Sequence, residues 1–587
     1  MAKWFLAAKR AEFEEIGKKY NISPVLARII RNRDIIEDAD IEKYLYGSLE
    51  NLYDGSLMKD MDKAVSVLQE KIHDKKRIRI IGDYDVDGIC STHILKQGLS
   101  ICGAAVDAVI PHRVKDGYGI NESLIEEAFK EGIDTIVTCD NGIAATGPLE
   151  YAASLGMTCI VTDHHEIPYE IEGETKRFCL PPAAAVVDPK QEDCSYPFKK
   201  ICGAVVAWKL VLKLWEGQQV SEMKQKELLE FAGIATVCDI MELLDENRII
   251  VKEALKSMAN SANAGLRALI RVHDLNPEKL SAYHIGFVIG PCFNATGRLD
   301  SAEKTLELLE CNNDREAIFL AAELKKMNES RKDMTEKAVE EAIEIVEEQE
   351  MWKDKIMVIY LPKCHESLAG IVAGRIKDKY TRPTIVLTDA EDCVKGSGRS
   401  IEAYSMYEEL SKCKEVFIKF GGHKLAAGMS LEEDKVDDLR KKLNENCALT
   451  EEDMEEKIVI DVPMPLSYVT KDFLEQLELL EPFGMGNSKP VFAQKNLTFL
   501  SMQKMGKNRN MAKFSVADEE GKRFTLILFR DLEQFLETVE QKYGNRVLQN
   551  FTENRAGYEV KMNVIYYPSI NEFRGEQQLQ FVMQHWN

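Results

Sequence analysis

The stretch RIRIIGDYDVDG, at residues 77–88, decides the fold class of this chain. It opens with a short apolar run and then turns abruptly to acids and glycine. Three similar segments follow: IDTIVTCDNGI at 133–143, MTCIVTDHHE at 157–166 and AAAVVDPK at 183–190. Helix-favouring stretches separate these segments. Strands that alternate with helices indicate a parallel sheet in an α/β domain, which we place over residues 71–260.

Polar residues follow the predicted strands at the points where the strands end, and one more acid ends a later apolar segment. These residues are Asp83, Asp85, Asp87, Asp140, Asp163, His164, His165 and Asp239. Ligands of open parallel sheets bind beyond the carboxyl ends of the strands. We therefore expect these side chains to converge on one rim of the sheet.

Such a cluster of carboxylates repels itself unless a counter-charge is present. Divalent metal ions supply that charge, and carboxylates mixed with imidazoles suit manganese or magnesium better than zinc. Two ions about 3.5–4 Å apart can activate water and stabilise both oxygens of an in-line phosphoryl displacement. A single Asp at a strand end is more often a turn or helix-cap residue. The joint occurrence favours a metal site.

The rest of the chain predicts a multidomain α/β protein. Residues 1–70 are expected to form a helical and mixed segment. Residues 261–350 end in a long charged stretch that is typical of a solvated connecting helix. We expect a second α/β block over residues 351–455. The tail, residues 456–587, alternates with a period of two residues, which indicates a small β-barrel.

Composition bounds the function classes. The 587 residues are 45% hydrophobic and 30% charged, as in a soluble globular protein, and no apolar run of about 18 residues predicts a membrane span. Fourteen cysteines without a CxxC pair indicate free thiols in a reducing cytosol. The absence of a GxxxxGK[ST] segment disfavours P-loop enzymes. The net charge of −22 weighs against nucleic-acid binding, although a local basic channel and bound cations can offset it.

A series of segments resembles, in order, the motifs of the DHH phosphoesterase superfamily, and in particular those of its RecJ family. These segments are DYDVDG at 83–88, the Asp140 segment, DHH at 163–165, ATVCDIMELLDENR at 235–248, GPCFNATGRLDSA at 290–302, CHESLAGIVAGR at 364–375, KGSGRS at 395–400, GGHKLAAG at 421–428 and LEPFGMGNSKPVF at 480–492. The resemblance implies a DHH domain at 71–260, a substrate-arginine segment with the connecting helix at 261–350, a DHHA1 domain at 351–455 and an OB-fold-like nucleic-acid-binding domain at 456–587.

The resemblance also implies roles for individual residues. Two Mn²⁺ or Mg²⁺ ions would be held by Asp83, Asp85, Asp87, Asp140, His164 and Asp239. Catalysis would depend on Asp140 and on His165, which would contact the scissile phosphate. The nucleic-acid backbone would be gripped by Arg298, Arg375, Ser397, Arg399, Gly421, Gly422 and His423. A tight turn also explains the GGH segment, and a surface salt bridge also explains Arg375.

The sequence departs from the family pattern at three places. Ile81 stands where many relatives have a metal-ligating His, and Cys292 stands where a basic residue is common. CHESLAG replaces a WHxGVIG form and so lacks its aromatic residue. These departures bear on metal affinity and metal preference more than on the reaction class.

The resemblance implies a single-stranded-DNA-specific exonuclease that works 5′ to 3′, releases 5′-mononucleotides and serves DNA recombination and repair. We expect a cytoplasmic monomer without membrane contact, with a single-strand-binding protein or a helicase as a candidate partner. One alternative is a DHH enzyme for short oligonucleotides or cyclic dinucleotides. Another is an inactive DNA-binding scaffold. The residues leave the choice between DNA and RNA open.

Overall fold

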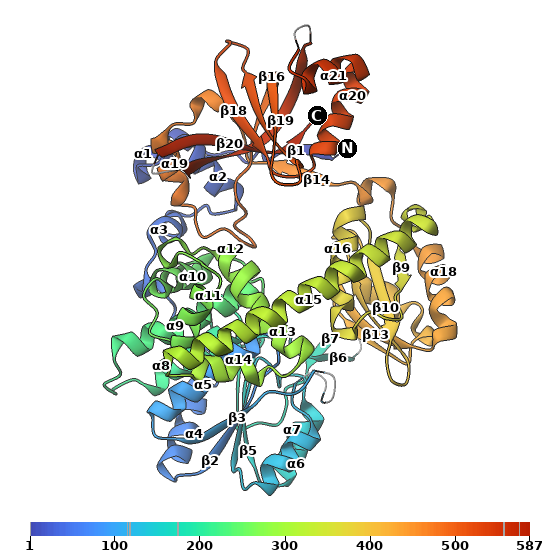
Figure 1. Ribbon diagram of the computed structural model, residues 1–587. Coiled ribbons are helices and arrows are strands. Elements are labelled where there is room, and N and C mark those ends of the chain that lie inside the picture. Colours follow the sequence, from blue (N-terminus) through green and yellow to red (C-terminus); the bar gives the residue numbers. More distant parts are fainter. Residues whose placement is uncertain (1, 114–115, 117–118, 173–174, 556–557, 574–575) are drawn as a thin grey trace. The chain divides into compact units, whose positions relative to one another are not determined.

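The computed structural model describes residues 2–113, 116, 119–172, 175–555, 558–573 and 576–587. The chain forms two compact units, one of Met1–Gly47 with Glu455–Asn587 and the other of Ser48–Met454 (Figure 1). Among the helices described, none has the length and apolar character needed to cross a membrane.

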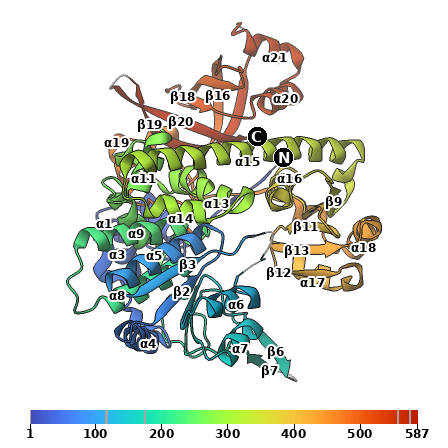
Figure 2. The same ribbon diagram turned by 60° about the horizontal axis from the view of Figure 1, so that its bottom comes forward.

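The larger unit contains a parallel five-stranded sheet with the strand order β3-β2-β4-β5-β8, as the sequence predicts. Its strands are β2 (Arg77–Ile81), β3 (Ala105–Val109), β4 (Thr135–Cys139), β5 (Thr158–Thr162) and β8 (Ala185–Val187). A small hairpin of β6 (Tyr169–Glu172) and β7 (Thr175–Phe178) follows β5. The inner strands are buried because helices cover both faces of the sheet (Figure 2).

Alternating side chains of the strands form a separate core on each face. Ile78 and Ile80 pack with helices α4 (Met61–His73), α5 (Val86–Ile101), α8 (Gly203–Leu214) and α9 (Glu222–Cys238). Ile81 and Ile136 pack on the other side with α6 (Glu122–Lys130) and α7 (Thr146–Ser154). This two-sided core leaves the ends of the strands as the accessible part of the sheet.

Further helices build on the first of these cores. They are α10 (Asp245–Met258), α11 (Ala264–Val272), α12 (Ala282–His284), the π-helix η4 (Ile285–Ile289), α13 (Gly290–Leu299), α14 (Glu303–Glu310) and α15 (Asp314–Glu348). The connecting helix α15 is less solvated than its charge predicts. Its first half buries Ala317, Ala321 and Leu324 in the core of the sheet domain, and its second half buries Ala342 and Val346 against the next domain.

The next domain is a five-stranded mixed sheet in the order β12-β13-β11-β10-β9, in which only β9 and β10 run parallel. Its strands are β9 (Met357–Tyr360), β10 (Thr384–Asp389), β11 (Val394–Arg399), β12 (Lys419–Gly422) and β13 (Ala426–Leu431). Its helices are α16 (Ala369–Tyr380), α17 (Met406–Ser411) and α18 (Val436–Asn446). The predicted second α/β block is therefore present, with mostly antiparallel pairing.

The smaller unit contains the predicted barrel, which closes because β16 pairs with both β17 and β19. Its strands are β15 (Val462–Pro463), β16 (Phe492–Met505), β17 (Met511–Ala517), β18 (Arg523–Leu528), β19 (Val560–Phe573) and β20 (Glu576–Trp586), and its helices are α19 (Lys471–Glu478), α20 (Leu532–Tyr543) and α21 (Asn545–Thr552). Phe499, Phe514 and Phe535 pack their rings against one another in the core.

The first residues of the chain belong to the smaller unit and do not form the separate segment 1–70 that we expect from the sequence. Strand β1 (Lys3–Leu6) pairs in parallel with β14 (Lys457–Ile460). Helices α1 (Phe13–Tyr20), α2 (Pro24–Asn32) and α3 (Asp38–Tyr46) follow. Asn32 donates to the Asp461 carbonyl at 3.2 Å, so tertiary pairing over more than 400 residues defines this unit.

Candidate metal centre

The acids of the predicted rim lie where strands β2, β4 and β5 end. Asp140 directly follows β4 and adopts a left-handed backbone conformation with φ +58°, while its N–H donates to Thr162 O at 3.1 Å. Asp163 directly follows β5, and Asp83 lies two residues beyond β2. A Cβ on Gly88 would come within 2.4 Å of Asp83 O, so this glycine lets helix α5 approach the Asp83 loop. The three strand ends thus bring the acids to one edge of the sheet.

Two of the acids of DYDVDG are held by helix N-termini. The Asp85 carboxylate caps α5 and accepts from Asp87 N at 2.9 Å and Gly88 N at 3.1 Å. The Asp87 carboxylate accepts from Gly203 N and Ala204 N, both at 2.7 Å, at the start of α8. Helix N-termini carry partial positive charge, which stabilises a carboxylate there. Both side chains are therefore fixed before any ligand arrives.

His164 lies among three carboxylates. Its Nε2 is 3.1 Å from Asp140 Oδ1, 3.5 Å from Asp87 Oδ2 and 3.6 Å from Asp239 Oδ2. Asp239 directly follows α9 and Asp87 lies in the first turn of α5, so residues from two helices and from the ends of β4 and β5 meet at this imidazole. The donor atoms of His164, Asp87 and Asp239 all lie within 4.8 Å of one another, which is close enough for these three side chains to share one cation.

Burial and mutual repulsion disfavour the ionised form of these carboxyl groups. Burial and the Asp85 charge raise the pKa of Asp83 well above its usual range. Burial, followed by the Asp87 and Asp85 charges, does the same to the pKa of Asp140, and it raises the pKa of Asp239 to about 8. Asp83 Oδ1 and Asp239 Oδ2 are buried without a hydrogen-bond partner. Unpartnered buried carboxylate oxygens are the expected donors for divalent cations.

The potential ligands form three overlapping sets, within each of which the donor atoms lie within 4.8 Å of one another. These sets are Asp83–Asp85–Asp140, Asp87–His164–Asp239 and Asp140–His164–His165. Asp140 occurs in two sets and His164 in two, so they can link neighbouring cations. Oxygen donors with one or two imidazoles fit Mn²⁺ or Mg²⁺.

Asp163 orients the histidines rather than offering a free ligand atom. Its Oδ1 accepts from His165 Nδ1 at 2.7 Å and from His164 N at 2.7 Å, and its Oδ2 accepts from Ile143 N at 2.9 Å. Burial lowers the pKa of His165, but the hydrogen bond and charge of Asp163 outweigh it and raise that pKa to about 9. The pair thus favours an imidazolium at the edge of the centre.

A group of arginines lies beside the acidic centre, where Arg113 interacts with Asp83 and Arg298 with Asp85. Burial, and then the charges of Arg113, Arg331 and Arg399, lower the pKa of Arg298 to about 10. Arg298 lies at the end of α13, where its Nη1 donates to Ser367 O at 2.6 Å. Arg399, at the end of β11, donates to Gly398 O at 2.8 Å. Two of the four arginines were predicted from the sequence, and the cluster supplies a local basic surface on a chain of negative net charge.

The other predicted contact residues lie in the same unit with less distinctive surroundings. Arg375 is exposed on α16, and Ser397 lies in β11 opposite Gly428. Gly421 pairs with Gly428, and Gly422, with φ +148°, would place a Cβ 2.4 Å from Ala426 O. The exposed His423 follows and donates its N–H to Ala426 O at 2.8 Å. Their contacts with nucleic acid stay predictions.

The sequence interpretation missed Arg113 and Arg331 as members of this cluster. Arg113 comes four residues after β3, beyond the carboxyl end of a parallel strand, so the strand-end rule contains the signal. Its guanidinium lies 4.8 Å from the centroid of the Tyr84 ring. Arg331 lies in α15, where its Nη2 donates to Asn328 Oδ1 at 2.9 Å. Because charged residues occur along the whole of that helix, the sequence does not distinguish this position.

Two departures from the family pattern have structural explanations. Ile81 is fully buried in β2 and packs with the α6–α7 core, so it adds no ligand. Cys292 is buried in α13, with its Sγ 3.3 Å from Val288 O and 3.6 Å from Asn328 Nδ2. His365, in the CHESLAG segment, has its Nδ1 2.8 Å from Ser367 Oγ.

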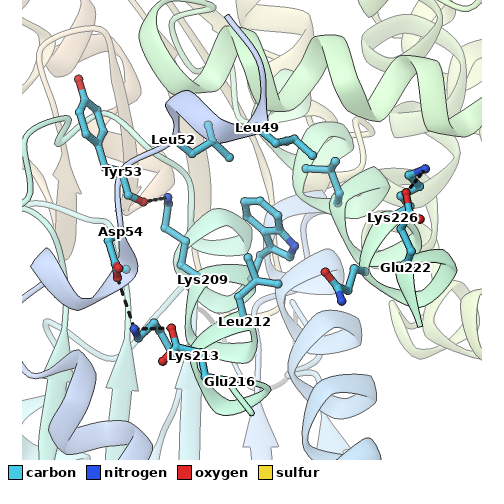
Figure 3. A pocket seen from close by; sticks show the side chains of 14 residues that line it. Leu49, Leu52, Tyr53, Asp54, Lys209, Leu212, Lys213, Glu216, Glu222 and Lys226 are labelled. Atoms are coloured by element: carbon cyan, nitrogen blue, oxygen red, sulfur yellow. Dashed lines mark hydrogen bonds and ion pairs between the residues drawn. The ribbon is translucent and has the colours of Figure 1, made fainter. Parts of the chain in front are cut away.

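A separate pocket of about 400 Å³ lies farther along α8 and contains none of the candidate ligands (Figure 3). Trp208, Leu212 and Leu229 give it apolar walls. Its lysines are engaged: Lys213 Nζ is 2.5 Å from Glu216 Oε1, and Lys226 Nζ is 2.7 Å from Glu222 Oε1. We assign it no part in the chemistry.

Comparisons with known proteins agree with this architecture. The DHH family, N-terminal domain, matches residues 77–236, the DHHA1 domain matches 353–449, and the RecJ OB domain matches 460–585. The single-stranded-DNA-specific exonuclease RecJ of Escherichia coli is 32% identical over 82% of this chain and 85% of that protein. The Bacillus subtilis protein of that name is 35% identical over 86% of this chain, which spans 63% of its length.

Among solved structures, RecJ of Thermus thermophilus in complex with Mn²⁺ aligns with a TM-score of 0.80 at 25% identity. The alignment covers all of this chain and 79% of that one. A second structure of the same protein holds Mg²⁺. Domain order, sequence identity over most of the chain and fold coincide: the chain belongs to the RecJ family of DHH phosphoesterases.

Proposed function

We propose that the chain is a metal-dependent exonuclease that hydrolyses single-stranded DNA from the 5′ end and releases 5′-mononucleotides. Asp83, Asp85, Asp87, Asp140, His164 and Asp239 are its metal ligands, and Asp140 and His165 its catalytic residues. The observation that carries the proposal is the overlap of three ligand sets through Asp140 and His164. Such an overlap suits two adjacent divalent ions, Mn²⁺ or Mg²⁺, whose charge would offset that of the clustered carboxylates.

The residues of the chain divide the work of hydrolysis. When bound, the ions supply an activated water and stabilise the charge that develops on the phosphate. Asp140 holds the two ligand sets together, and Asp163 fixes the orientation of His165. His165, held as an imidazolium, donates a hydrogen bond to the phosphate oxygens. Arg298 and Arg399 then hold neighbouring phosphates, since an arginine fork matches phosphate geometry.

Contacts to the nucleic-acid backbone are assigned to Arg298, Arg375, Ser397, Arg399, Gly421, Gly422 and His423. The OB domain supports a polymeric substrate, because OB-folds bind single strands by stacking bases on aromatic side chains. Of the aromatic residues in this domain, Tyr566 is buried and donates to Met464 O at 2.8 Å, which supports a core role rather than stacking on bases.

We further infer a cytoplasmic monomer that receives single strands from a helicase or a single-strand-binding protein and serves recombination and repair. All fourteen cysteines are free thiols, which supports a reducing compartment.

A time course on a long single strand, labelled at either end, tests the proposal in the presence of Mn²⁺. Immediate release of a labelled mononucleotide from the 5′-labelled strand, and late release from the 3′-labelled strand, is the expected result. Survival of the long strand while dinucleotides disappear would instead favour a small-substrate DHH enzyme. Failure to bind Mn²⁺ would favour an inactive scaffold.

A further inference from the structure

A pocket of about 610 Å³ opens beside His165. Its lining residues come from the loops after β4 and β5, from the start of α7 and from the β12–β13 hairpin. They are Gly119, Ile120, Asn141, Gly142, Ile143, Ala144, Ala145, Pro148, Asp163, His165, Glu166 and His423. We infer that this terminal-nucleoside pocket receives the base and sugar of the nucleotide at the 5′ end. The inference rests on the proposed function and adds to it a binding site for the leaving nucleoside.

The chemistry of the walls suits a flat, largely apolar group. Ile120, Ile143, Ala144, Ala145 and Pro148 supply apolar surface. None of the described residues that line it is Lys or Arg. A base and a deoxyribose would bury apolar surface against these walls.

The polar side chains of the floor are already engaged. Asn141 Nδ2 donates to Ile81 O at 3.1 Å and to Cys139 O at 2.9 Å, and its Oδ1 accepts from Ile120 N at 3.3 Å. The Asp163 carboxylate is taken up by the two histidines and Ile143 N. Base edges are distinguished by hydrogen bonds, which this floor does not offer. Asn141 and Asp163 therefore leave the choice of base open, as digestion along an arbitrary strand requires.

The position of the pocket matches a single nucleotide between two phosphates. His165 forms one wall, at the edge of the metal centre where the scissile phosphate is proposed to lie. His423, proposed to grip the backbone, lines the pocket from the next domain of the same unit. The nucleoside between these two phosphates is the one that each cut releases.

Two 5′-phosphorylated single strands of the same sequence test the inference, one with a normal first nucleotide and one with an abasic tetrahydrofuran unit there. The readout is kcat/KM for the first cut in Mn²⁺. Burying about 50 Å² of base surface predicts a preference of roughly tenfold for the normal strand. Strands that begin with A, C, G or T should differ by no more than about threefold, since binding without hydrogen-bond readout discriminates weakly.

Ala144→Phe fills the pocket from an exposed position and should bring the preference for the normal strand close to one. Ala153→Phe is the matched control, because Ala153 is exposed on α7 and is not among the pocket residues. This control should keep the full preference. Equal cutting of both strands by the unaltered protein, or an unchanged preference in Ala144→Phe, overturns the pocket but leaves the exonuclease standing. Digestion of neither strand overturns both.

Discussion

Two groups of buried acids in the larger unit have opposite surroundings. Asp140 is 3% exposed and lies among four like charges, which with burial raise its pKa well above the usual range. Glu246, at the start of α10, is fully buried, yet Lys209 Nζ lies 3.0 Å from its Oε2 and the Tyr196 hydroxyl donates to its Oε1. Lys209 Nζ and Glu246 Oε2 form an ion pair whose geometry is not that of a hydrogen bond.

The difference separates a functional site from a structural one. Burial is common to both, so burial alone does not identify a site. Glu246 has its counter-charge within the fold, and Lys209 is held further by the Tyr53 carbonyl at 2.7 Å. In the metal centre, positive charge from His165, Arg113 and Lys190 reaches Asp83 and Asp239, yet burial and mutual repulsion still raise the pKa of Asp83, Asp140 and Asp239. The fold thus retains an electrostatic cost there that a ligand relieves.

Asp140→Asn should cause the largest change. We expect exonuclease activity to fall about a thousandfold or more, ~4 kcal/mol, because the residue that links two ligand sets loses its charge. Asn tolerates the left-handed backbone at this position, so the fold should be kept. The rate on single-stranded DNA with Mn²⁺ and the unfolding midpoint without metal measure the two effects.

The metal-free Asp140→Asn protein should be at least as stable as the unaltered one, since a repelled charge is gone. Asp140→Ala is a harsher comparison, because it adds backbone strain at φ +58°. Activity retained in either variant would refute the two-metal assignment.

Glu246→Gln should lower stability and leave activity unchanged, the opposite of what we expect for Asp140→Asn. It leaves Lys209 buried without its counter-charge, so we expect a loss of about 3 kcal/mol in the free energy of unfolding, measured with urea. The rate per folded molecule should not change. Glu242→Gln is the control: Glu242 pairs with Lys200 at 2.6 Å on the surface, and the expected loss is below about 0.5 kcal/mol. Equal losses in both variants would remove the distinction between a buried and an exposed pair.

Much of the candidate centre could be predicted because strand ends and acids are local features of the sequence. The runs that become β2, β4 and β5 are short, apolar and followed at once by acids, and the strand-end rule then brings Asp83, Asp140 and His164 together. The parallel sheet, the second α/β block and the barrel followed from the same kind of periodicity.

The rest depends on contacts between distant segments. The pairing of β1 with β14 joins residues more than 450 positions apart, and no local sequence pattern predicts it. The buried stripes of α15 hide among its charges, and with them the inward position of Arg331. The ion pair of Lys209 and Glu246 also depends on contacts between distant segments. In the sequence both look like ordinary surface charges, and only the packing of α8 and α10 brings them together.

Adding Mn²⁺ tests the difference between the metal centre and the Glu246 site through an effect of intermediate size. Mn²⁺ at a hundred times its dissociation constant should raise the free energy of unfolding by about 2.7 kcal/mol, because it binds only the folded centre. Glu246→Gln should retain that increment, since its lesion lies elsewhere, and Asp140→Asn should lose most of it. Calorimetric scans with and without Mn²⁺ measure all three. An undiminished increment in Asp140→Asn would place the bound ion at another site.

Glu230, in α9, is a third case and has the smallest expected effect. It is buried and accepts from Ser257 at 2.6 Å and Ser261 at 2.5 Å, which compensate it with hydroxyls rather than charge. Burial outweighs these hydrogen bonds and raises its pKa to about 7 from an ordinary value of 4.5. Its contribution to stability is therefore complete below about pH 4.5 and is lost as the pH rises towards 7, because the unfolded chain ionises first.

Glu230→Gln should remove this pH dependence. Between pH 5 and pH 8 the unaltered protein should lose about 1–3 kcal/mol relative to the variant, as urea unfolding at both values would measure. Glu222→Gln, an exposed residue of the same helix paired with Lys226, should leave the pH dependence in place. If Glu230→Gln changes stability equally at both pH values, the carboxyl is ionised in the fold throughout. Hydroxyl groups would then compensate a buried acid as fully as Lys209 compensates Glu246, and only the metal centre would stand apart.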